Sequence, residues 1–243
     1  MTRYTIFLVT MLCIPLLFSC TSVERDNPFD ENSIDYKPIW NSVSQYVFTD
    51  SRDGKQYKAI GYEYKIEIYE GFKPIWSVVW MGENLNYNAS GSICYLNDPD
   101  NCNKYGRLYN WETAMTVCPS GWHLPSYEEW RELGAATFGK ITGQDVGRLS
   151  EAGMYLRADR GWDAACNGNN DFFSALPGGY SEYRSFDGVG IEGRWWIGDA
   201  KREYFPYITT SCSNINVSYD ILRGYYTSGG SDIFLSVRCV KNN

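Results

Sequence analysis

Hydrophobic and polar residues alternate along the first part of the chain in the way that β-strands require. From Tyr46 this alternation runs through the segments Gln56–Ile60, Tyr62–Tyr69 and Ile75–Met81. Asp53-Gly54 is a turn signal, and a Gly-Phe-Lys-Pro sequence separates the last two segments. Successive side chains of a strand point to opposite faces, so this alternation indicates strands with one buried face. The pattern predicts an antiparallel meander.

Two short helices are predicted downstream of the meander. The first covers Trp111–Val117, with Asn110 as its N-cap and Pro119 beyond its end. The second begins after a capping box, in which Ser126 and Glu129 have the spacing that lets each side chain reach the other's backbone N–H. The apolar positions of this second helix are Trp130, Leu133 and Phe138.

The remaining segments give weaker patterns. Residues 82–108 are rich in Gly, Asn, Asp and Pro, which predicts irregular structure. Beyond Gly139 short apolar runs alternate with Gly-, Asn- and Ser-rich loops, a weak helical pattern covers Gln144–Tyr155, and Ile233–Val240 predicts a closing strand. The expected fold class is α+β, with two short helices, small antiparallel sheets and long ordered loops.

Composition supports a folded domain and excludes one class of partner. Hydrophobic residues make up 44% of the 243 residues and charged residues 21%, which is typical of a chain with a core. The 20 Tyr, 9 Trp and 23 Gly favour short strands and ordered loops over a helical bundle. The net charge of -7 argues against binding to nucleic acid, since phosphate contacts need a basic face.

The N-terminus has the features of an export signal. Arg3 supplies a positive charge, and the apolar stretch Ile6–Phe18 is shorter than the ~20 residues that a membrane-spanning helix needs. The sequence Leu17-Phe18-Ser19-Cys20 resembles a bacterial lipobox, in which the cysteine is acylated after cleavage. The alternative is an ordinary secretory signal with an incidental cysteine.

We therefore expect three parts. A signal peptide occupies residues 1–19, the lipidated Cys20 and a flexible tether occupy residues 20–45, and a single domain occupies residues 46–243. The tether is expected because Thr21–Lys37 is polar, contains Pro28 and offers few residues to a core.

Cysteine usage indicates disulfides. Cys13 leaves with the signal and Cys20 carries the lipid, and an even number of remaining cysteines in an exported chain is typical of a disulfide framework. Spacing predicts a bond between Cys94 and Cys102 across a turn-rich loop. A zinc site is disfavoured because the chain has no C-x2-C pair and its one histidine is His123. The six body cysteines are Cys94, Cys102, Cys118, Cys166, Cys212 and Cys239.

Several phrases in a fixed order carry a family resemblance. They are Trp80–Tyr87, Lys104–Trp111, Cys118–Ser126, Phe173–Tyr180 and Ser236–Val240. Together they resemble the Fibrobacter succinogenes major paralogous domain, a family of exported bacterial proteins without an established biochemical activity. The resemblance extends over residues 46–241. The chain departs from the family pattern after Trp195-Trp196, where Ile-Gly-Asp-Ala replaces the usual Ser-Ala-Thr.

The same region is more distantly similar to C-type-lectin-like domains. Trp111, Ala114 and Cys118 match a first-helix pattern of that fold, and His123-Leu124 precedes the capped second helix. The resemblance implies a C-type-lectin-like, disulfide-stapled fold. It also implies a disulfide between Cys118 and Cys239. Cys166 and Cys212 then remain as a third pair that closes a long loop. Formylglycine-generating enzymes are similar to this fold as well.

Candidate chemistry is sparse. His123 is expected to be a structural hydrogen-bonding residue, because no catalytic partner can be identified by spacing. Asp98, Asp100 and Asn101 lack the D-x-D-x-D-G series of calcium loops, so a turn is expected there and no metal. Trp and Tyr are dense in the Gly-rich second half, where they either fill the core or stack on a ligand. The candidate ligand-binding residues are Trp162, Trp195 and Trp196.

These observations predict a non-catalytic lipoprotein of the bacterial cell envelope, anchored at the outer membrane or cell surface through lipid. We expect a binding or adhesion module for polysaccharide or an envelope protein, with no cofactor. Two alternatives stay open. One is a structural envelope protein without a small ligand. The other is an enzyme related to the formylglycine-generating group, which would need a free, reactive thiol.

Overall fold

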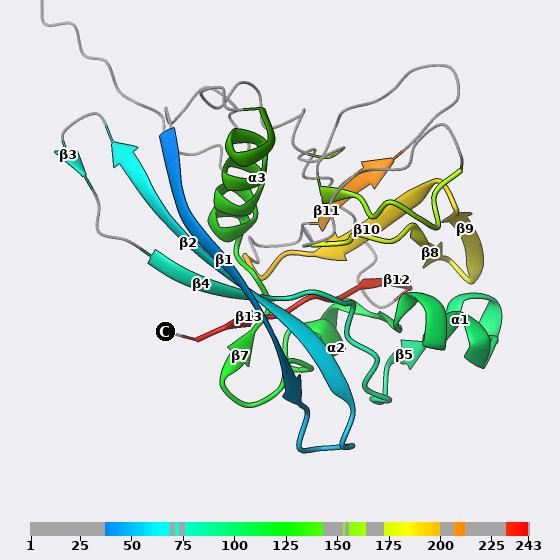
Figure 1. Cartoon of the computed structure of the whole chain (residues 1–243). Coiled ribbons are helices and arrows are strands. Elements are labelled where there is room, and N and C mark those ends of the chain that lie inside the picture. The colour runs from blue at the N-terminus through cyan, green and yellow to red at the C-terminus, as the bar shows by residue number, and fades with distance from the viewer. Residues whose placement is uncertain are drawn as a thin grey trace, which may run out of the picture.

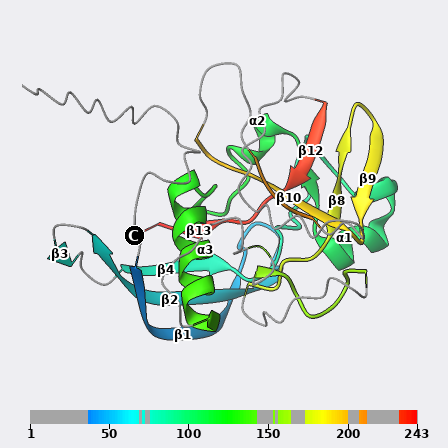
Figure 2. The same ribbon diagram turned by 90° about the horizontal axis from the view of Figure 1, so that it is seen from above.

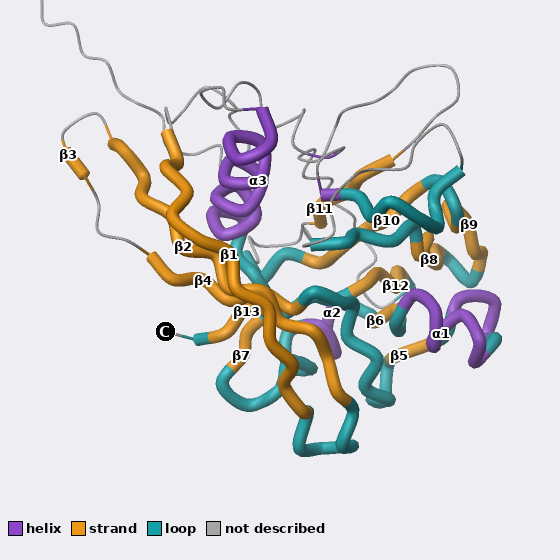
Figure 3. The backbone as a smooth tube through the Cα atoms, viewed as in Figure 1, coloured by secondary structure: helices purple, strands orange, loops and turns teal. Residues whose placement is uncertain are grey.

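The computed structural model describes residues 37–68, 71–72, 76–142, 153, 156–163, 173–199, 207–211 and 232–242. In this part of the chain the fold is mixed, with mostly β-structure and a few short helices, so the α+β class is confirmed (Figures 1 and 3). The helical elements are the 3-10 turn η1 (Tyr95–Asn97), α1 (Pro99–Tyr105), α2 (Trp111–Ala114) and α3 (Tyr127–Thr142).

The first sheet is built on the predicted meander. Its strand order is β1-β2-β4-β13-β7, with β3 paired to β2, and all its pairs are antiparallel. β2 continues as one strand where two segments were expected. The bounds are β1 Lys37–Thr49, β2 Gln56–Ile68, β3 Gly71–Phe72, β4 Trp76–Met81, β7 Trp122–His123 and β13 Val240–Lys241.

The first strand begins earlier than the sequence indicates. Lys37 pairs with Glu67, and the ladder continues to Thr49 opposite Gln56. Residues 37–45 therefore belong to a strand, and their assignment to the tether was wrong. The cause is pairing with the long strand β2, which supplies backbone partners that a polar sequence alone does not reveal.

The second sheet contains the shorter strands. Its order is β11-β10-β8-β12-β6-β5, with β9 paired to β8, and β10 also runs parallel to β12. In Figure 1 this sheet lies to the side of the first one. The bounds are β5 Ser92–Ile93, β6 Leu108–Tyr109, β8 Gly178–Glu182, β9 Ser185–Val189, β10 Glu192–Trp196, β11 Tyr207–Ser211 and β12 Ile233–Ser236.

Helix α3 covers a face of the first sheet. It lies against β1, and Figure 2 shows it across the sheet from above. Its Trp130 ring packs edge-on against Trp80 of β4 at 4.8 Å. The predicted capping box is confirmed, since Glu129 N donates to Ser126 Oγ at 3.2 Å and Ser126 N donates to Glu129 Oε2 at 2.7 Å.

The other two helices correct the sequence prediction. α2 has the expected cap, with Thr113 N donating to Asn110 Oδ1 at 3.0 Å, but it ends at Ala114 instead of Val117. A tighter bond from Thr116 N to Thr113 O ends it. α1 lies in the segment that was expected to be irregular. Asp98 caps it and Pro99 is its first residue, a combination that favours helix starts.

The C-terminal segment joins the two sheets. The single closing strand predicted over Ile233–Val240 is instead split between β12 in the second sheet and β13 in the first. In the residues between β12 and β13, the carbonyl of Val237 accepts from Leu85 N at 2.8 Å and that of Cys239 accepts from Met81 N at 3.0 Å. Cys239 is fully buried and forms a disulfide with Cys118, whose Cα lies 5.9 Å away.

The disulfide predictions that fall within the described residues are confirmed. Cys94 bonds to Cys102 and Cys118 bonds to Cys239. Cys20, Cys166 and Cys212 lie outside the described residues, as does most of Gln144–Tyr155. Around the long-range disulfide the core gathers side chains of both sheets and of α2. Its largest members are Tyr57, Tyr109, Trp111, Trp196 and Tyr207.

Candidate functional site

The three tryptophans proposed as ligand-binding residues are core residues. The exposed fractions are 5% for Trp162, 2% for Trp195 and zero for Trp196. Each indole N–H is also satisfied inside the protein. The acceptors are Ala175 O for Trp162 at 2.9 Å, Asn84 Oδ1 for Trp195 at 2.8 Å and Tyr109 O for Trp196 at 2.7 Å. The expectation that these rings form a binding surface was wrong, because a loop-rich fold uses its aromatic residues to fill the core.

A polar groove of about 450 Å³ lies elsewhere on the domain. One wall comes from the hairpin of β1 and β2, and the other from the end of α1 with Arg160 and Leu176. Between the walls lie residues of the segment that follows β4, among them Glu83, Asn84 and Asn86. The groove therefore joins parts of the chain that are distant in sequence, from the β1–β2 hairpin to Arg238.

The hairpin wall follows from strand geometry. Val47 pairs with Lys58 and Gln45 with Ile60, so these four side chains share one face of the sheet. All four line the groove. Ile60 is buried, whereas Val47 is 60% exposed and Lys58 is also exposed. The opposite face of the hairpin carries Phe48 and Tyr57, whose rings stack at 5.5 Å.

The floor of the groove is a buried polar network centred on Asn84. Its side-chain oxygen accepts from Trp195 Nε1 at 2.8 Å and from Arg238 Nε at 2.9 Å. Its amide nitrogen donates to Tyr105 O at 2.8 Å and to Ser236 Oγ at 3.4 Å. With four hydrogen bonds, this amide joins the segment after β4 to α1, β10, β12 and the C-terminal segment, and so fixes the groove floor.

Arg238 places a charge in the floor. Arg238 is 1% exposed, and its guanidinium carbon lies 3.9 Å from the centre of the Phe173 ring. Its NH2 nitrogen donates to Ser174 O at 3.0 Å. The NH1 nitrogen donates to Phe173 O. Because burial disfavours the charged form, it lowers the pKa of Arg238 to about 9. The side chain therefore remains cationic near neutral pH.

The rim offers hydrogen-bonding side chains and one exposed apolar side chain. Asn86, Asn103 and Lys104 contribute amide and ammonium groups. Val47 is 60% exposed on the groove side of the hairpin, whereas Tyr46 pairs with Ala59 and so carries its ring on the opposite face. Amide donors and acceptors beside an accessible apolar side chain suit a hydroxyl-rich ligand, because amides bond the hydroxyls while apolar groups pack on sugar faces.

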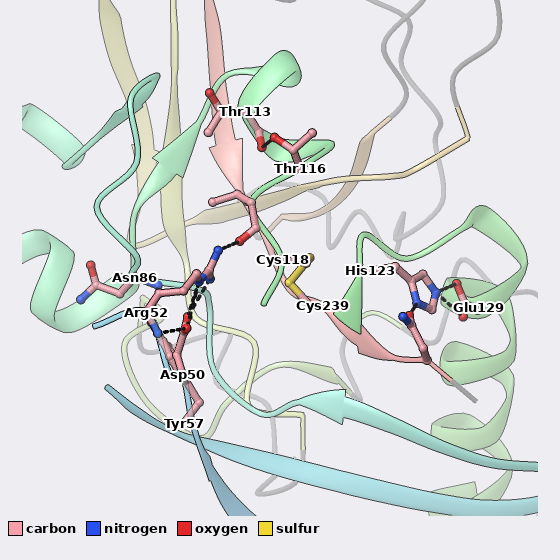
Figure 4. Close-up of a disulfide and its surroundings, with 12 residues drawn as sticks. Asp50, Arg52, Tyr57, Asn86, Thr113, Thr116, Cys118, His123, Glu129 and Cys239 are labelled. Atoms are coloured by element: carbon pink, nitrogen blue, oxygen red, sulfur yellow. Dashed lines mark hydrogen bonds and ion pairs between the residues drawn. A yellow bond between two sulfur atoms is a disulfide. The ribbon is translucent and has the colours of Figure 1, made fainter. Parts of the chain in front are cut away.

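A second polar cluster lies near the Cys118–Cys239 disulfide (Figure 4). His123 contacts Asn242 Oδ1 through Nδ1 at 2.7 Å and Glu129 Oε1 through Nε2 at 2.9 Å. These bonds join β7 to the C-terminus and to the start of α3, which confirms the expected hydrogen-bonding role. Arg52 is held by Asp50 through two nitrogens, at 2.9 and 2.6 Å, and donates to Val117 O at 2.7 Å.

Within the described ranges, no three His, Cys, Asp or Glu side chains are grouped as a metal site requires. The four described cysteines are all in disulfides. No helix in this part of the chain is long and apolar enough to cross a membrane.

Sequence reasoning did not identify the groove. Asn84, Asn86 and Arg238 lie inside phrases that carried the family resemblance, yet no local pattern indicated their role. The bond between Asn84 and Arg238 spans 154 positions of sequence. Only the meeting of the two sheets brings such residues together.

Comparison with known proteins gives one match. A family model described as the Fibrobacter succinogenes major domain matches residues 75–241. The matched range runs from β4 to β13 and includes both disulfides, Asn84 and Arg238, whereas the β1–β2 wall of the groove lies outside it. No curated protein matches the chain significantly, and no solved structure does.

Proposed function

The chain belongs to the Fibrobacter succinogenes major domain family, and from this premise we propose that it is a non-catalytic binding module that holds a glycan in the polar groove. The observation that carries the proposal is the groove itself. Its floor is fixed by four hydrogen bonds of the Asn84 side chain, and its rim presents the amides of Asn86 and Asn103 beside the exposed Val47. A rigid floor lowers the entropic cost of ordering a ligand.

The composition of the groove favours binding over hydrolysis. Glycoside hydrolysis uses two carboxyl groups on either side of the scissile bond. The lining contains one carboxylate, Glu83, and its Oε2 atom accepts a hydrogen bond from Lys58 N at 3.1 Å. The cysteine of the lining, Cys102, is in a disulfide and offers no nucleophilic thiol.

We propose further that the scaffold is C-type-lectin-like. Support comes from the Cys118–Cys239 bond, which joins the segment after α2 to the C-terminal segment, and from the capped helix α3 that follows. The competing roles, a structural envelope protein and an enzyme related to the formylglycine-generating group, predict no glycan binding at the groove. The enzyme would in addition need a reactive thiol outside the described cysteines.

Binding to a polysaccharide panel tests the proposed function. We expect the full-length protein, purified in mild detergent, to bind at least one soluble plant, algal or envelope polysaccharide in affinity electrophoresis. Asn103→Ala, which removes an exposed rim amide, should weaken that binding by about 0.5–1.5 kcal/mol, as for one lost hydrogen bond. Asn88→Ala is the matched control, because Asn88 is an exposed asparagine outside the groove lining.

Two results would contradict the proposal. One is the absence of binding across the panel, which would favour a structural role. The other is binding that Asn103→Ala and Asn88→Ala affect equally, since the site would then lie outside the groove.

We propose that the module is held at the bacterial cell envelope by lipid on Cys20, on the strength of the Leu-Phe-Ser-Cys sequence. Acyl chains contribute about 0.8 kcal/mol per buried CH2 group, and more than one chain gives stable anchoring. Cys20→Ser should therefore abolish labelling with a radioactive fatty acid and move the protein to the soluble fraction. Membrane retention of the unlabelled variant would contradict lipid anchoring.

A further inference from the structure

The groove is positively charged although the chain as a whole is negative. Six charged side chains line it, and only Glu83 is acidic. The complete chain has a net charge of -7. Basic side chains therefore outnumber acidic ones in the groove, although the chain as a whole is acidic. The five basic residues of the lining are Lys55, Lys58, Lys104, Arg160 and Arg238.

Two of these basic groups already have carboxylate partners. Lys55 Nζ lies 3.8 Å from Asp53 and also donates to Asn86 O. Arg160 NH1 lies 3.3 Å from Asp159. These groups contribute little net attraction, because an exposed ion pair is largely compensated and screened.

The other three have no carboxylate partner within the described part of the chain. No carboxylate there lies within 4 Å of the Lys58 or Lys104 ammonium group, and Lys104 Nζ packs 4.6 Å from the Tyr105 ring. The Arg238 guanidinium bonds only neutral acceptors, namely Asn84 Oδ1 and the carbonyls of Phe173 and Ser174. Glu83 attracts it without a direct bond and offsets part of its charge. The remaining field is felt more strongly in the low dielectric beneath the groove than in water.

We propose that the groove selects a carboxylated polysaccharide, with uronic-acid carboxylates placed between Lys58 on the hairpin wall and Lys104 on the α1 wall, above the Arg238 charge. The inference rests on the proposed glycan-binding function and adds the charge of the ligand. A carboxylate in this position supplies the counter-charge that these groups lack. The amides of Asn86 and Asn103 remain available for the sugar hydroxyls.

The test compares two ligands with the same sugar backbone, one with free carboxylates and one with neutral methyl esters. Isothermal titration of the full-length protein in mild detergent would use oligogalacturonate and its fully methyl-esterified form. We expect the acid form to bind at least about tenfold more tightly at low salt, and this preference to shrink as ionic strength rises. A sulfated polysaccharide of equal charge density serves as a third ligand, and weaker binding than the acid form is expected.

Charge variants then locate the effect. Lys58→Gln and Lys104→Gln should each weaken binding of the acid form about two- to fivefold, and Glu83→Gln should strengthen it. Binding of the ester should change little. Lys241→Gln is the control, because it removes the same charge from an exposed position outside the groove lining and should have no effect.

The outcomes separate the inference from the proposed function. Equal binding of acid and ester, with the Asn103→Ala loss intact, would overturn charge selection and leave the glycan site standing. A preference for the acid form that neither Lys58→Gln nor Lys104→Gln reduces, or tighter binding of the sulfated ligand, would also overturn it. If no ligand of the panel or of this series binds, the proposed function itself fails.

Discussion

Replacing Cys118 and Cys239 together with alanine will lower the free energy of unfolding by about 3–5 kcal/mol. The bond spans 121 positions of sequence and links the segment after α2 to the C-terminal segment that joins both sheets. In the chain-entropy model, a longer loop removes more freedom from the unfolded state. Alanine is preferred to serine because Cys239 is fully buried, and a hydroxyl there would need a partner. Chemical denaturation followed by tryptophan fluorescence measures the change.

The second disulfide provides a matched control. Cys94 and Cys102 are only 8 positions apart, so the same model gives their alanine pair a loss smaller by about 2 kcal/mol. Peptide mapping of the non-reduced protein should first show Cys118 and Cys239 joined. Equal losses from the two alanine pairs would contradict the assignment of the long-range bond as the main covalent constraint on the fold.

Asn84→Leu will destabilise the domain by about 3–5 kcal/mol. The substitution removes the only oxygen that accepts from both Trp195 Nε1 and Arg238 Nε, and both donors are buried. A buried donor left unsatisfied costs about 1–3 kcal/mol, and more when it is charged. The shape of leucine is close to that of asparagine, so the loss reports the hydrogen bonds more than the packing. The measurement is again chemical denaturation.

Asn86→Leu is the control for this effect. Asn86 lies two residues further along the same segment and is only half-buried. Its backbone N–H donates to the Tyr57 hydroxyl, and its backbone C=O accepts from Lys55 Nζ. Its substitution should change stability by no more than about 0.5 kcal/mol. If the two leucine variants were equally stable, the buried network could not be what fixes the groove floor.

Local signals in the sequence predicted local structure well. Ser126 and Glu129 fixed the start of α3, and the Asp53-Gly54 turn placed β1 opposite β2, because both patterns act between neighbours in the chain. The signal for the start of α1 is also local, because Asp98-Pro99 favours the beginning of a helix. The many turn residues around it led instead to a prediction of irregular structure. The burial of Trp195 and Trp196 was different. Whether an aromatic ring lies in the core or on the surface depends on partners such as Trp130 and Trp111, which are distant in sequence.

The groove needed the folded structure for the same reason. Its walls come from a hairpin near residue 50 and a helix near residue 100, and its floor includes Arg238 near the C-terminus. No spacing rule connects such positions. The family resemblance identified the phrases around Asn84 and Arg238 without giving their role, and the division of residues 233–240 between two sheets followed from pairing that a single strand pattern does not encode.

Hydrogen exchange of the full-length protein, with and without oligogalacturonate, tests the central claim most directly. If the groove is the glycan site, ligand-induced protection of backbone amides will be concentrated in residues 45–58, 83–86 and 103–106, which form its walls and floor. The turn at Tyr183, on the β8–β9 hairpin, should exchange at the same rate in both samples. Protection centred on that hairpin, with the three groove segments unchanged, would contradict the account.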